Sequence, residues 1–231
     1  MATSPKRTDP LTRTEIARAA LEMVDRDGVD RFSMRRLANE LGVTTMAVYH
    51  HFENKAEILQ AAADQVWIEA FAAFDPQADP VEALIRGYLG ARWAFHRHSD
   101  VTPYAFASPT TEDAVHFAAL GIAQIFEQAG FVGRSAGEAY HVIATYTFGS
   151  AMLHAERTLL DRQIRRPVSD LADLAGGPLP EGTGEAYESV RDALGNDPDL
   201  VRFEKGLRAI VAGLLADAGI NPPAASGSRP D

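Results

Sequence analysis

Cysteine is absent from this chain of 231 residues. Its absence excludes a disulfide scaffold, a cysteine nucleophile and any zinc site with a cysteine ligand. No run approaches the ~18 consecutive apolar residues that a transmembrane helix needs. Residues 1–10 also lack the apolar segment of a signal peptide. We therefore expect a cytoplasmic protein that has no membrane partner and folds around its own apolar core.

Motifs of the common enzyme classes are also missing. The chain has no G-x-S-x-G, no H-E-x-x-H, no glycine loop that cradles a phosphate and no dinucleotide fingerprint. His96 and His98 are two residues apart, which on a helix points them to different sides, so no metal site is expected. We expect neither an enzyme nor a cofactor, although an enzyme of another class stays open as an alternative.

Positive charge is scarce outside the first quarter of the chain. The formal net charge is −10, which by itself argues against a nucleic-acid partner. Residues 1–55, however, hold nine Lys/Arg and eight Asp/Glu, whereas residues 56–231 hold thirteen and twenty-four. An acidic C-terminal part leaves the N-terminal part as the only surface that a phosphate backbone could approach. The same acidic surface could simply keep the protein in solution.

Helix starts and stops divide the rest of the sequence. Thr12-Arg13-Thr14-Glu15 has the spacing of a capping box, and Gly28 can end this first helix in the left-handed conformation. No segment shows convincing β-alternation, so the fold class is predicted to be all-α, with about nine or ten helices. Further helix starts are predicted at Ser33, Thr44, Asn54, Asp79, Ser135 and Asp197.

Three regions follow from this pattern. Residues 1–55 are predicted to hold an N-terminal arm, with Lys6 and Arg7, and a helix-turn-helix. A fourth helix from 55 to about 74 connects them to a larger helical domain over 75–220, and residues 221–231 are a Pro/Ser/Gly tail that we expect to be disordered. Residues 161–197 are rich in proline and glycine and are expected to be a mobile loop.

The segment from Ser33 to Lys55 carries the functional prediction. It reads as a helix, a turn with glycine and a second short helix, which is the order of a helix-turn-helix. The outer face of the second helix bears hydroxyl, imidazole, phenol and small apolar groups, which suit phosphates and base edges in a major groove. The alternative to a DNA-binding role is that the aromatic residues of this helix are ordinary core residues of a helical bundle.

This segment resembles the N-terminal domain of the TetR family of transcriptional regulators. The matching features are a helix ending at Gly28, Phe32-Ser33, Arg36-Leu37-Ala38, Leu41-Gly42-Val43, Tyr49 with His51-Phe52, and Asn54-Lys55. The resemblance implies a nucleoid-associated regulator, most often a repressor, that binds double-stranded DNA at a palindromic operator as a homodimer. The residues that fall where family members touch DNA are Arg35, Thr44, Thr45, Met46, Ala47, Tyr49, His50, His51 and Lys55.

The C-terminal part resembles the regulatory domain of the tetracycline-repressor type. In that type the long helix and the last helix pair with their copies, so the resemblance implies a dimer interface at Phe203, Leu207, Ile210 and Leu214, although packing inside one chain is the alternative. It also implies a pocket for a small-molecule ligand, with Trp93, His96, Tyr104, His116, His141 and Tyr146 as candidate lining residues.

The pocket sequence departs from the tetracycline-binding pattern. Where those proteins have a metal-binding histidine and a following threonine, this chain has Tyr104-Ala105-Phe106-Ala107-Ser108. We therefore expect that Mg-tetracycline is not the inducer. A ligand sensor that has lost DNA binding stays open as an alternative function.

Overall fold

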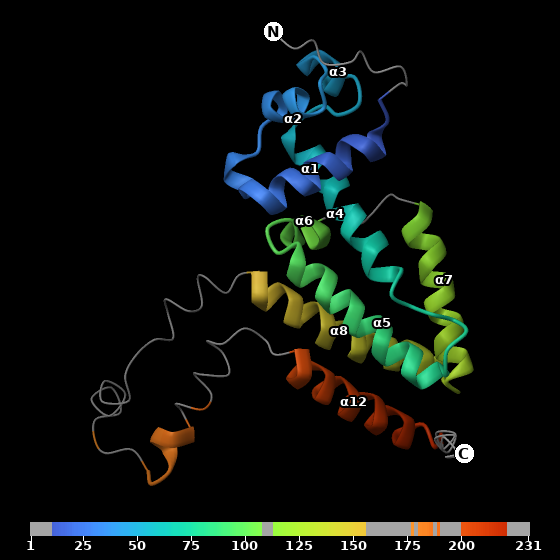
Figure 1. The fold of residues 1–231 in the computed structure, drawn as a ribbon. Helices are drawn as coiled ribbons and strands as arrows, with labels where there is room; N and C mark the ends of the chain where they lie inside the picture. The colour runs from blue at the N-terminus through green and yellow to red at the C-terminus, as the bar shows by residue number, and fades with distance from the viewer. Residues whose placement is uncertain are drawn as a thin grey trace, which may run out of the picture.

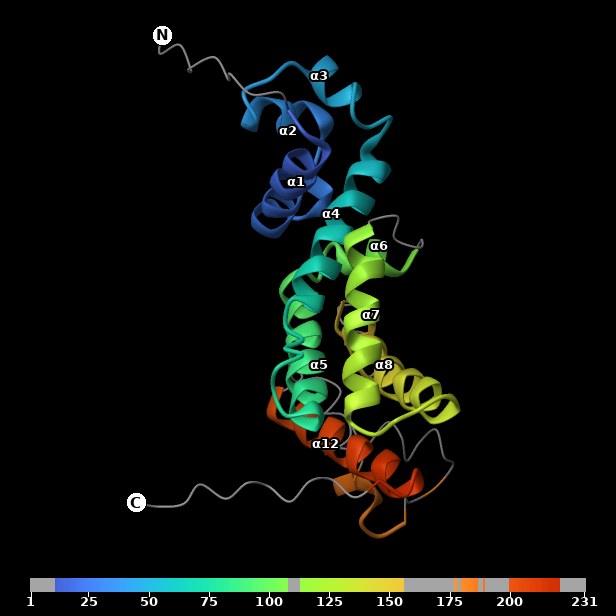
Figure 2. The ribbon, with the colours of Figure 1, turned by 90° about the vertical axis from the view of Figure 1, so that its right-hand side faces the viewer.

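The computed structural model describes residues 11–107, 113–155, 177, 180–186, 189 and 200–220; the side chains of 113–118, 154 and 155 lie outside this description. Within these residues the chain is helical and contains no strand, which confirms the all-α prediction. The helices form an elongated molecule, with α1–α3 at one end and α12 at the other (Figures 1 and 2). None of the described helices is long and apolar enough to cross a membrane. Four predicted features lie outside the described residues: the arm, most of the 161–197 loop, the helix start at Asp197 and the tail.

Helix α1 spans Arg13–Asp27 and begins as the sequence predicts. The Thr12 side chain accepts from the backbone N–H of Glu15, and the Glu15 carboxylate accepts from the backbone N–H of Thr12. The helix ends at Gly28, but with φ 83° and ψ 153° this glycine lies outside the left-handed helical region that we expected. Only glycine adopts this region readily, and here it leads into a 3-10 turn, η1, over Val29–Arg31.

Helices α2 (Met34–Glu40) and α3 (Thr45–Tyr49) form the predicted helix-turn-helix. Ser33 and Thr44 are the N-caps, accepting from the third backbone N–H of their helices. Gly42 has φ 68° and turns the chain between the two helices. Helix α3 is shorter than predicted, since the turn at its end already includes His50 and His51.

Helix α4 (Lys55–Phe71) is capped by Asn54 and leads from the N-terminal helices into the C-terminal ones (Figure 1). It also stops before the predicted end at Phe74. Helix α5 follows as Pro80–Arg97, with Asp79 as its N-cap and proline at its first position.

The remaining described helices are α6 (Thr102–Ala107), α7 (Asp113–Gln128), α8 (Arg134–Ala155) and α12 (Leu200–Asp217). Helix α8 corrects one prediction, because it begins one residue before the proposed cap Ser135. The Ser135 hydroxyl instead bonds to the N–H and the carbonyl of Val132, each at 3.0 Å. Glu138, the expected capping-box partner, pairs with Arg134 at 2.6 Å.

Two apolar cores run through the molecule. The first joins α1–α4 to residues of α5, α6 and α8, with Phe95, Val101, Ala105 and Ala151 packed against the N-terminal helices. The second lies between α5, α7, α8 and α12. The first core thus extends across the region of residues 55–75, where the domain division was predicted. The N-terminal helices therefore share a core with helices of the C-terminal part.

Candidate DNA-binding surface and ligand pocket

Helix α3 is held by one buried residue and exposes most of the others. Val48 is fully buried, whereas Met46 and Tyr49 are 64% and 46% exposed. His50 is exposed as well, while Thr45 and Ala47 are half-buried. An exposed methionine and tyrosine one helical turn apart are unusual on a solvated helix, whose outer face normally carries charge. They can contact a thymine methyl and a phosphate, as a groove-reading helix requires.

Arg13 fixes the end of α3 to α1, a role that the sequence did not suggest. Its guanidinium donates to the carbonyl of His51 and to Glu57 at 2.8 Å, and it lies 4.1 Å from the centre of the Phe52 ring. The Glu57 carboxylate also accepts from the backbone N–H of Glu53 at 2.7 Å. The bond from Glu53 and then that from Arg13 hold the pKa of Glu57 below its usual range. The C-terminal end of α3 is therefore held by contacts with α1 and α4.

Two arginines of this region are already neutralised by carboxylates. Arg26 pairs with Glu40 at 2.7 Å, and Arg36 with Asp27 at 2.6 Å. Hydrogen bonds from Arg26 lower the pKa of both carboxylates. Arg35, by contrast, is exposed, and within the described residues no hydrogen bond or ion pair engages it. It is thus the cation of α2 best placed to meet a phosphate.

Lys55 does not point outward in this structure. Its ammonium donates to the carbonyls of Val29 at 2.9 Å and Phe32 at 3.1 Å, and the side chain is half-buried. A phosphate contact by Lys55 stays a prediction, but its ammonium already uses two of its three donors to bind the turn before α2.

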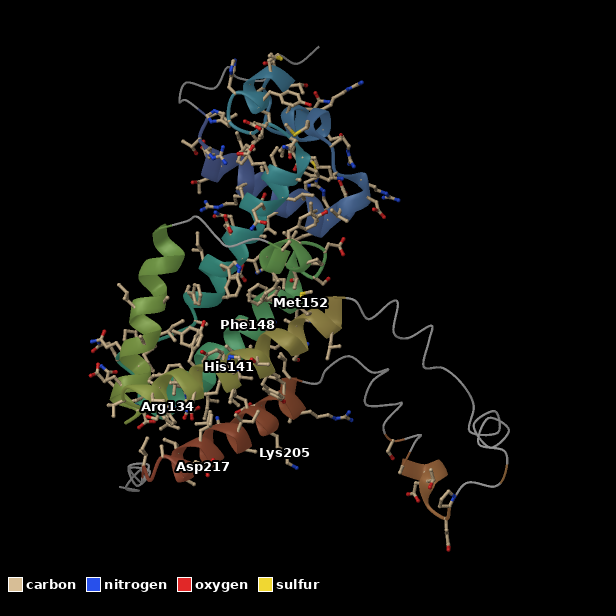
Figure 3. The ribbon with its side chains drawn as sticks, turned by 180° about the vertical axis from the view of Figure 1, so that it is seen from behind. Arg134, His141, Phe148, Met152, Lys205 and Asp217 are labelled. Carbon is tan, nitrogen blue, oxygen red and sulfur yellow. The ribbon has the colours of Figure 1, made fainter. Side chains whose placement is uncertain are left out.

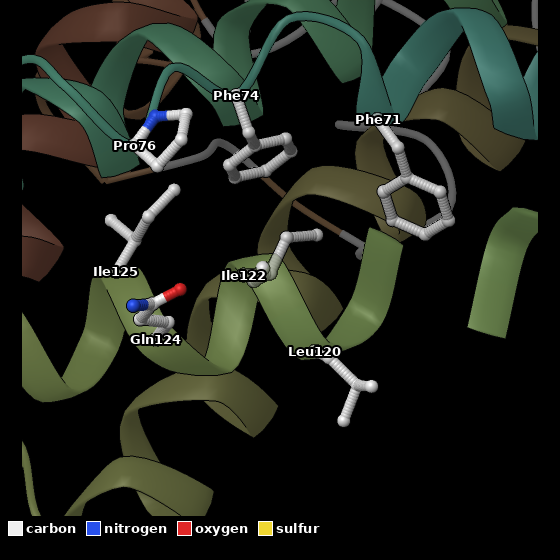
Figure 4. A pocket seen from close by; sticks show the side chains of 8 residues that line it. Phe71, Phe74, Pro76, Leu120, Ile122, Gln124 and Ile125 are labelled. Carbon is white, nitrogen blue, oxygen red and sulfur yellow. The ribbon is translucent and has the colours of Figure 1, made fainter. Parts of the chain in front are cut away.

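A pocket of about 370 Å³ opens between the end of α4 and helix α7. Phe71, Phe74 and Pro76 line one side of it, and Leu120, Gly121, Ile122, Gln124 and Ile125 line the other (Figure 4). The walls are apolar apart from one amide, which suits an apolar ligand with few polar groups. Of the six predicted ligand residues, none lines this pocket.

Two hydroxyls, those of Tyr88 on α5 and Thr147 on α8, are buried in the described structure without a hydrogen-bond partner. The Tyr88 ring meets the pocket residue Phe74 edge-on at 5.1 Å, and Thr147 is fully buried on α8. Within the described residues neither hydroxyl has a hydrogen-bond partner. Burial, and then the nearby Tyr140, raise the pKa of Tyr88, so that its hydroxyl keeps its proton. Each unpaired buried hydroxyl costs about 1–3 kcal/mol, a cost that a polar group of a ligand can remove.

Comparisons with known proteins agree with this arrangement. The family model of the bacterial regulatory proteins of the tetR family matches residues 16–62, which run from α1 into the first half of α4. An HTH-type transcriptional regulator from Saccharopolyspora erythraea is 29% identical, over 93% of this chain and 89% of the relative. The class A tetracycline repressor from transposon 1721 of Escherichia coli is also 29% identical, over 86% and 88%. Residues 16–62 therefore match the DNA-binding domain of the tetR family, and the chain is similar to regulators of that family over most of its length.

Solved structures of the TetR family share the whole fold. The Streptomyces coelicolor protein ActR, in its crystal structure with actinorhodin, is 26% identical and superposes with a TM-score of 0.68 over 92% of this chain and 99% of ActR. The likeness thus covers the C-terminal helices as well as the DNA-binding ones.

The six residues that the sequence proposed for the ligand site differ in their burial and in their contacts. Trp93 is 44% exposed under Arg97, and His141 is exposed on α8 (Figure 3). His96 and Tyr104 are half-buried. Tyr146 stacks on Phe203 of α12 at 4.9 Å. The side chain of His116 lies outside the described residues, as does that of His154. The unpaired hydroxyls of Tyr88 and Thr147 were missed as a pair, because nothing local in the sequence distinguishes them from core residues.

The residues proposed for the dimer interface are also partly internal. Phe203 and Leu207 are 4% and 0% exposed and fill the second core of the chain itself, while Ile210 and Leu214 are half-buried. Both side chains have little or no accessible surface left for a second chain, because they pack into the core that α12 shares with α5 and α8. Helices α8 and α12 lie side by side (Figure 3). Their exposed apolar residues are Tyr140, Val142, Leu153, Leu200 and Val201.

Among the described side chains, no three or more histidine, aspartate and glutamate residues are grouped so as to hold a metal ion.

Proposed function

We propose that the protein is a repressor whose homodimer binds a palindromic operator and leaves it when a small molecule enters the C-terminal helices. The observation that carries this proposal is helix α3. It is anchored by Val48 and braced by Arg13, yet it exposes Met46, Tyr49 and His50. A rigid helix with an outward face of this kind reads base edges. Two such helices related by a two-fold axis read a palindrome.

The ligand part of the proposal is supported by Tyr88 and Thr147. Their hydroxyls are buried without partners in the described structure, and aromatic rings surround Tyr88. The related ActR has been crystallised with actinorhodin. We infer a largely apolar ligand with at least two polar atoms, one for each hydroxyl. The earlier expectation that Mg-tetracycline does not act as inducer stays part of this proposal.

Binding to DNA is tested first. A duplex selected with the protein from a random pool is titrated by fluorescence anisotropy over a salt series, beside a scrambled duplex of equal length. We expect the selected duplex to bind ~10³-fold or more tightly than the scrambled one, with affinity falling as salt rises. Equal affinity for both duplexes, or none for either, would support a ligand sensor without operator binding.

Ligand binding is tested on the two hydroxyls. Compounds that raise the melting temperature of the wild type are measured again on Tyr88→Phe and Thr147→Val, with Tyr146→Phe as control, because the Tyr146 hydroxyl already donates to the Phe203 carbonyl at 3.4 Å. We expect the first two variants to lose ligand response while keeping operator affinity. Tyr146→Phe should lose less, because the Tyr146 hydroxyl already has a partner, and an equal loss in Tyr146→Phe would make Tyr146 a ligand residue as the sequence predicted. Tyr88→Phe without ligand should be no less stable than the wild type, because it removes an unpaired buried hydroxyl. A ligand that stabilises both variants as it stabilises the wild type would place the site elsewhere.

A further inference from the structure

His98 lies at the corner between α5 and α6, where the ligand-side helices meet the DNA-binding helices. It follows the last residue of α5, and its side chain is 3% exposed. Its Nδ1 lies 2.8 Å from a carboxylate oxygen of Asp25 on α1, and its Nε2 lies 3.1 Å from one of Glu69 on α4. One imidazole thus touches carboxylates from two other helices, 73 and 29 residues away in the sequence.

The two contacts specify the protonation state of His98. A carboxylate only accepts hydrogen bonds, and a neutral imidazole carries one N–H. Both contacts can therefore be hydrogen bonds only when the ring is an imidazolium. Burial by itself lowers the pKa of His98, but the hydrogen bonds with Asp25 and then Glu69 outweigh it and raise that pKa above its usual value.

Other charged groups at this corner support the same arrangement. Arg97, the neighbour of His98 on α5, pairs with Glu69 at 3.3 Å. Asp100 accepts from the backbone N–H of Val29 at 3.3 Å, next to the end of α1. From α6, Thr102 contributes a neutral hydroxyl that donates to the carbonyl of His98 at 3.0 Å. Residues 98–100 therefore contact the DNA-binding helices through polar groups at two points, His98 on α1 and Asp100 on η1.

We propose that His98 is a proton-dependent tie which holds helix α1, and with it the DNA-reading helices, against the corner of the ligand domain. This proposal goes beyond the proposed function, because it makes operator affinity depend on the protonation of His98. Protonated His98 satisfies both carboxylates. Neutral His98 leaves one of them facing a ring nitrogen without a hydrogen, in a site with little access to water.

The sign of the pH effect follows from the raised pKa. The tie is fully present below the ordinary pKa of histidine and is lost as pH rises through the higher folded-state value. Above that pH the DNA-reading helices are held less firmly against the ligand domain. DNA binding must then restrict a motion that was already restricted at lower pH, so affinity falls.

The test compares the wild type with His98→Gln, and uses His141→Gln as the matched control because His141 is exposed on α8. Affinity for the selected duplex is measured at pH 6 and pH 9. Every other titratable group is common to wild type and variant, so the ratio of wild-type to variant affinity at each pH isolates the contribution of His98. We expect that ratio for His98→Gln to be at least ~5-fold at pH 6, the lower end of typical coupling between sites, and to approach unity at pH 9. For His141→Gln it should stay near unity at both.

Two further measurements do not depend on DNA. The histidine ring resonances of the intact protein are titrated by NMR. The midpoint of His98 should lie above the ordinary histidine value of ~6.5 and should fall in Glu69→Gln and in Asp25→Asn. The decrease in urea midpoint that His98→Gln causes should be smaller at pH 9 than at pH 6. A His98 midpoint at or below ~6.5, or an equal decrease at both pH values, would overturn the proposal. If no duplex binds but these two measurements agree, the tie stands and the proposed function fails.

Discussion

At the scale of single residues, the residues that anchor helix α3 differ from those proposed to contact DNA. Val48 has no accessible surface, and Arg13 binds the carbonyl that follows the helix at His51. His50 lies between these fixed points and is exposed. Its imidazole can donate to or accept from a base edge. Because the backbone on both sides is held in place, we expect a contact between His50 and a base edge to be selective.

His50→Ala is therefore expected to weaken binding to the selected duplex by about 1–3 kcal/mol and to change affinity for scrambled DNA little. Arg35→Ala is the matched comparison, because an exposed cation on phosphate carries no sequence information and should weaken both duplexes alike. Anisotropy titrations of both variants on both duplexes measure this. Unchanged affinity of His50→Ala for the selected duplex would contradict the placement of α3 in the groove.

Lys55 has two expected effects that can be told apart. Its ammonium bonds to the carbonyls of Val29 and Phe32, so Lys55→Ala should lower the free energy of unfolding by about 1–3 kcal/mol, as measured by urea titration. If it also contacts phosphate at the start of α4, as the sequence suggested, the variant should weaken both duplexes equally and reduce the salt slope by roughly one per subunit. Selective loss of the operator alone would contradict both roles.

At the scale of helices, local signals located most ends and long-range contacts modified some. The capping box at Thr12 and the N-caps Ser33 and Asn54 occur as predicted, because each uses atoms within three residues. The cap predicted at Ser135 is wrong, since Gly133 at φ 55° turns the chain and α8 begins at Arg134. The spacing of residue types alone cannot predict the first residue of this helix, because the preceding turn determines it.

Gly28 illustrates a helix end that a specific backbone conformation fixes. Its φ of 83° and ψ of 153° belong to glycine alone, so Gly28→Ala should cost about 1–3 kcal/mol of stability. Gly137→Ala is the control, because Gly137 lies inside α8 with no atom within 4 Å of a new side-chain carbon. That variant should be unchanged or stabilised by about 0.5–1 kcal/mol. Urea titrations that give equal effects for the two variants would contradict this explanation.

At the scale of the whole molecule, the last helix closes the ligand-side bundle. Phe203 and Leu207 enter the second core, and Arg208 reaches Glu82 of α5 at 3.0 Å. This exposed pair contributes little to stability compared with the buried side chains. The surface available for contact with a second chain is therefore the outer side of α12, together with the exposed residues of α8.

The dimer is expected to depend on that outer side. Leu153 on α8 is 59% exposed, and Leu153→Glu should shift the sedimenting species toward ~25 kDa at micromolar concentration, because a buried symmetric contact then receives the same charge twice. Met46→Glu is the matched control, since Met46 is 64% exposed on α3, far from α12 at the other end of the molecule. A wild type that already sediments at ~25 kDa would rule out the homodimer.

The sequence by itself determined the helical class, most helix starts and the location of the DNA-reading segment. These depend on caps, glycines and helical periodicity, which act over a few residues. It also identified the apolar stripe Phe203–Leu214, but not that Phe203 and Leu207 face their own chain. An apolar stripe looks the same whether it is buried in one chain or between two.

Tertiary structure alone decided which polar groups meet. Tyr88 and Thr147 become notable only because folding removes both hydroxyls from water without giving them a partner in the described structure. His98, Asp25 and Glu69 lie far apart in the sequence, and no local pattern connects them. Their contact depends on how α1, α4 and α5 cross, and that crossing is set by the packing of the shared core rather than by any short motif.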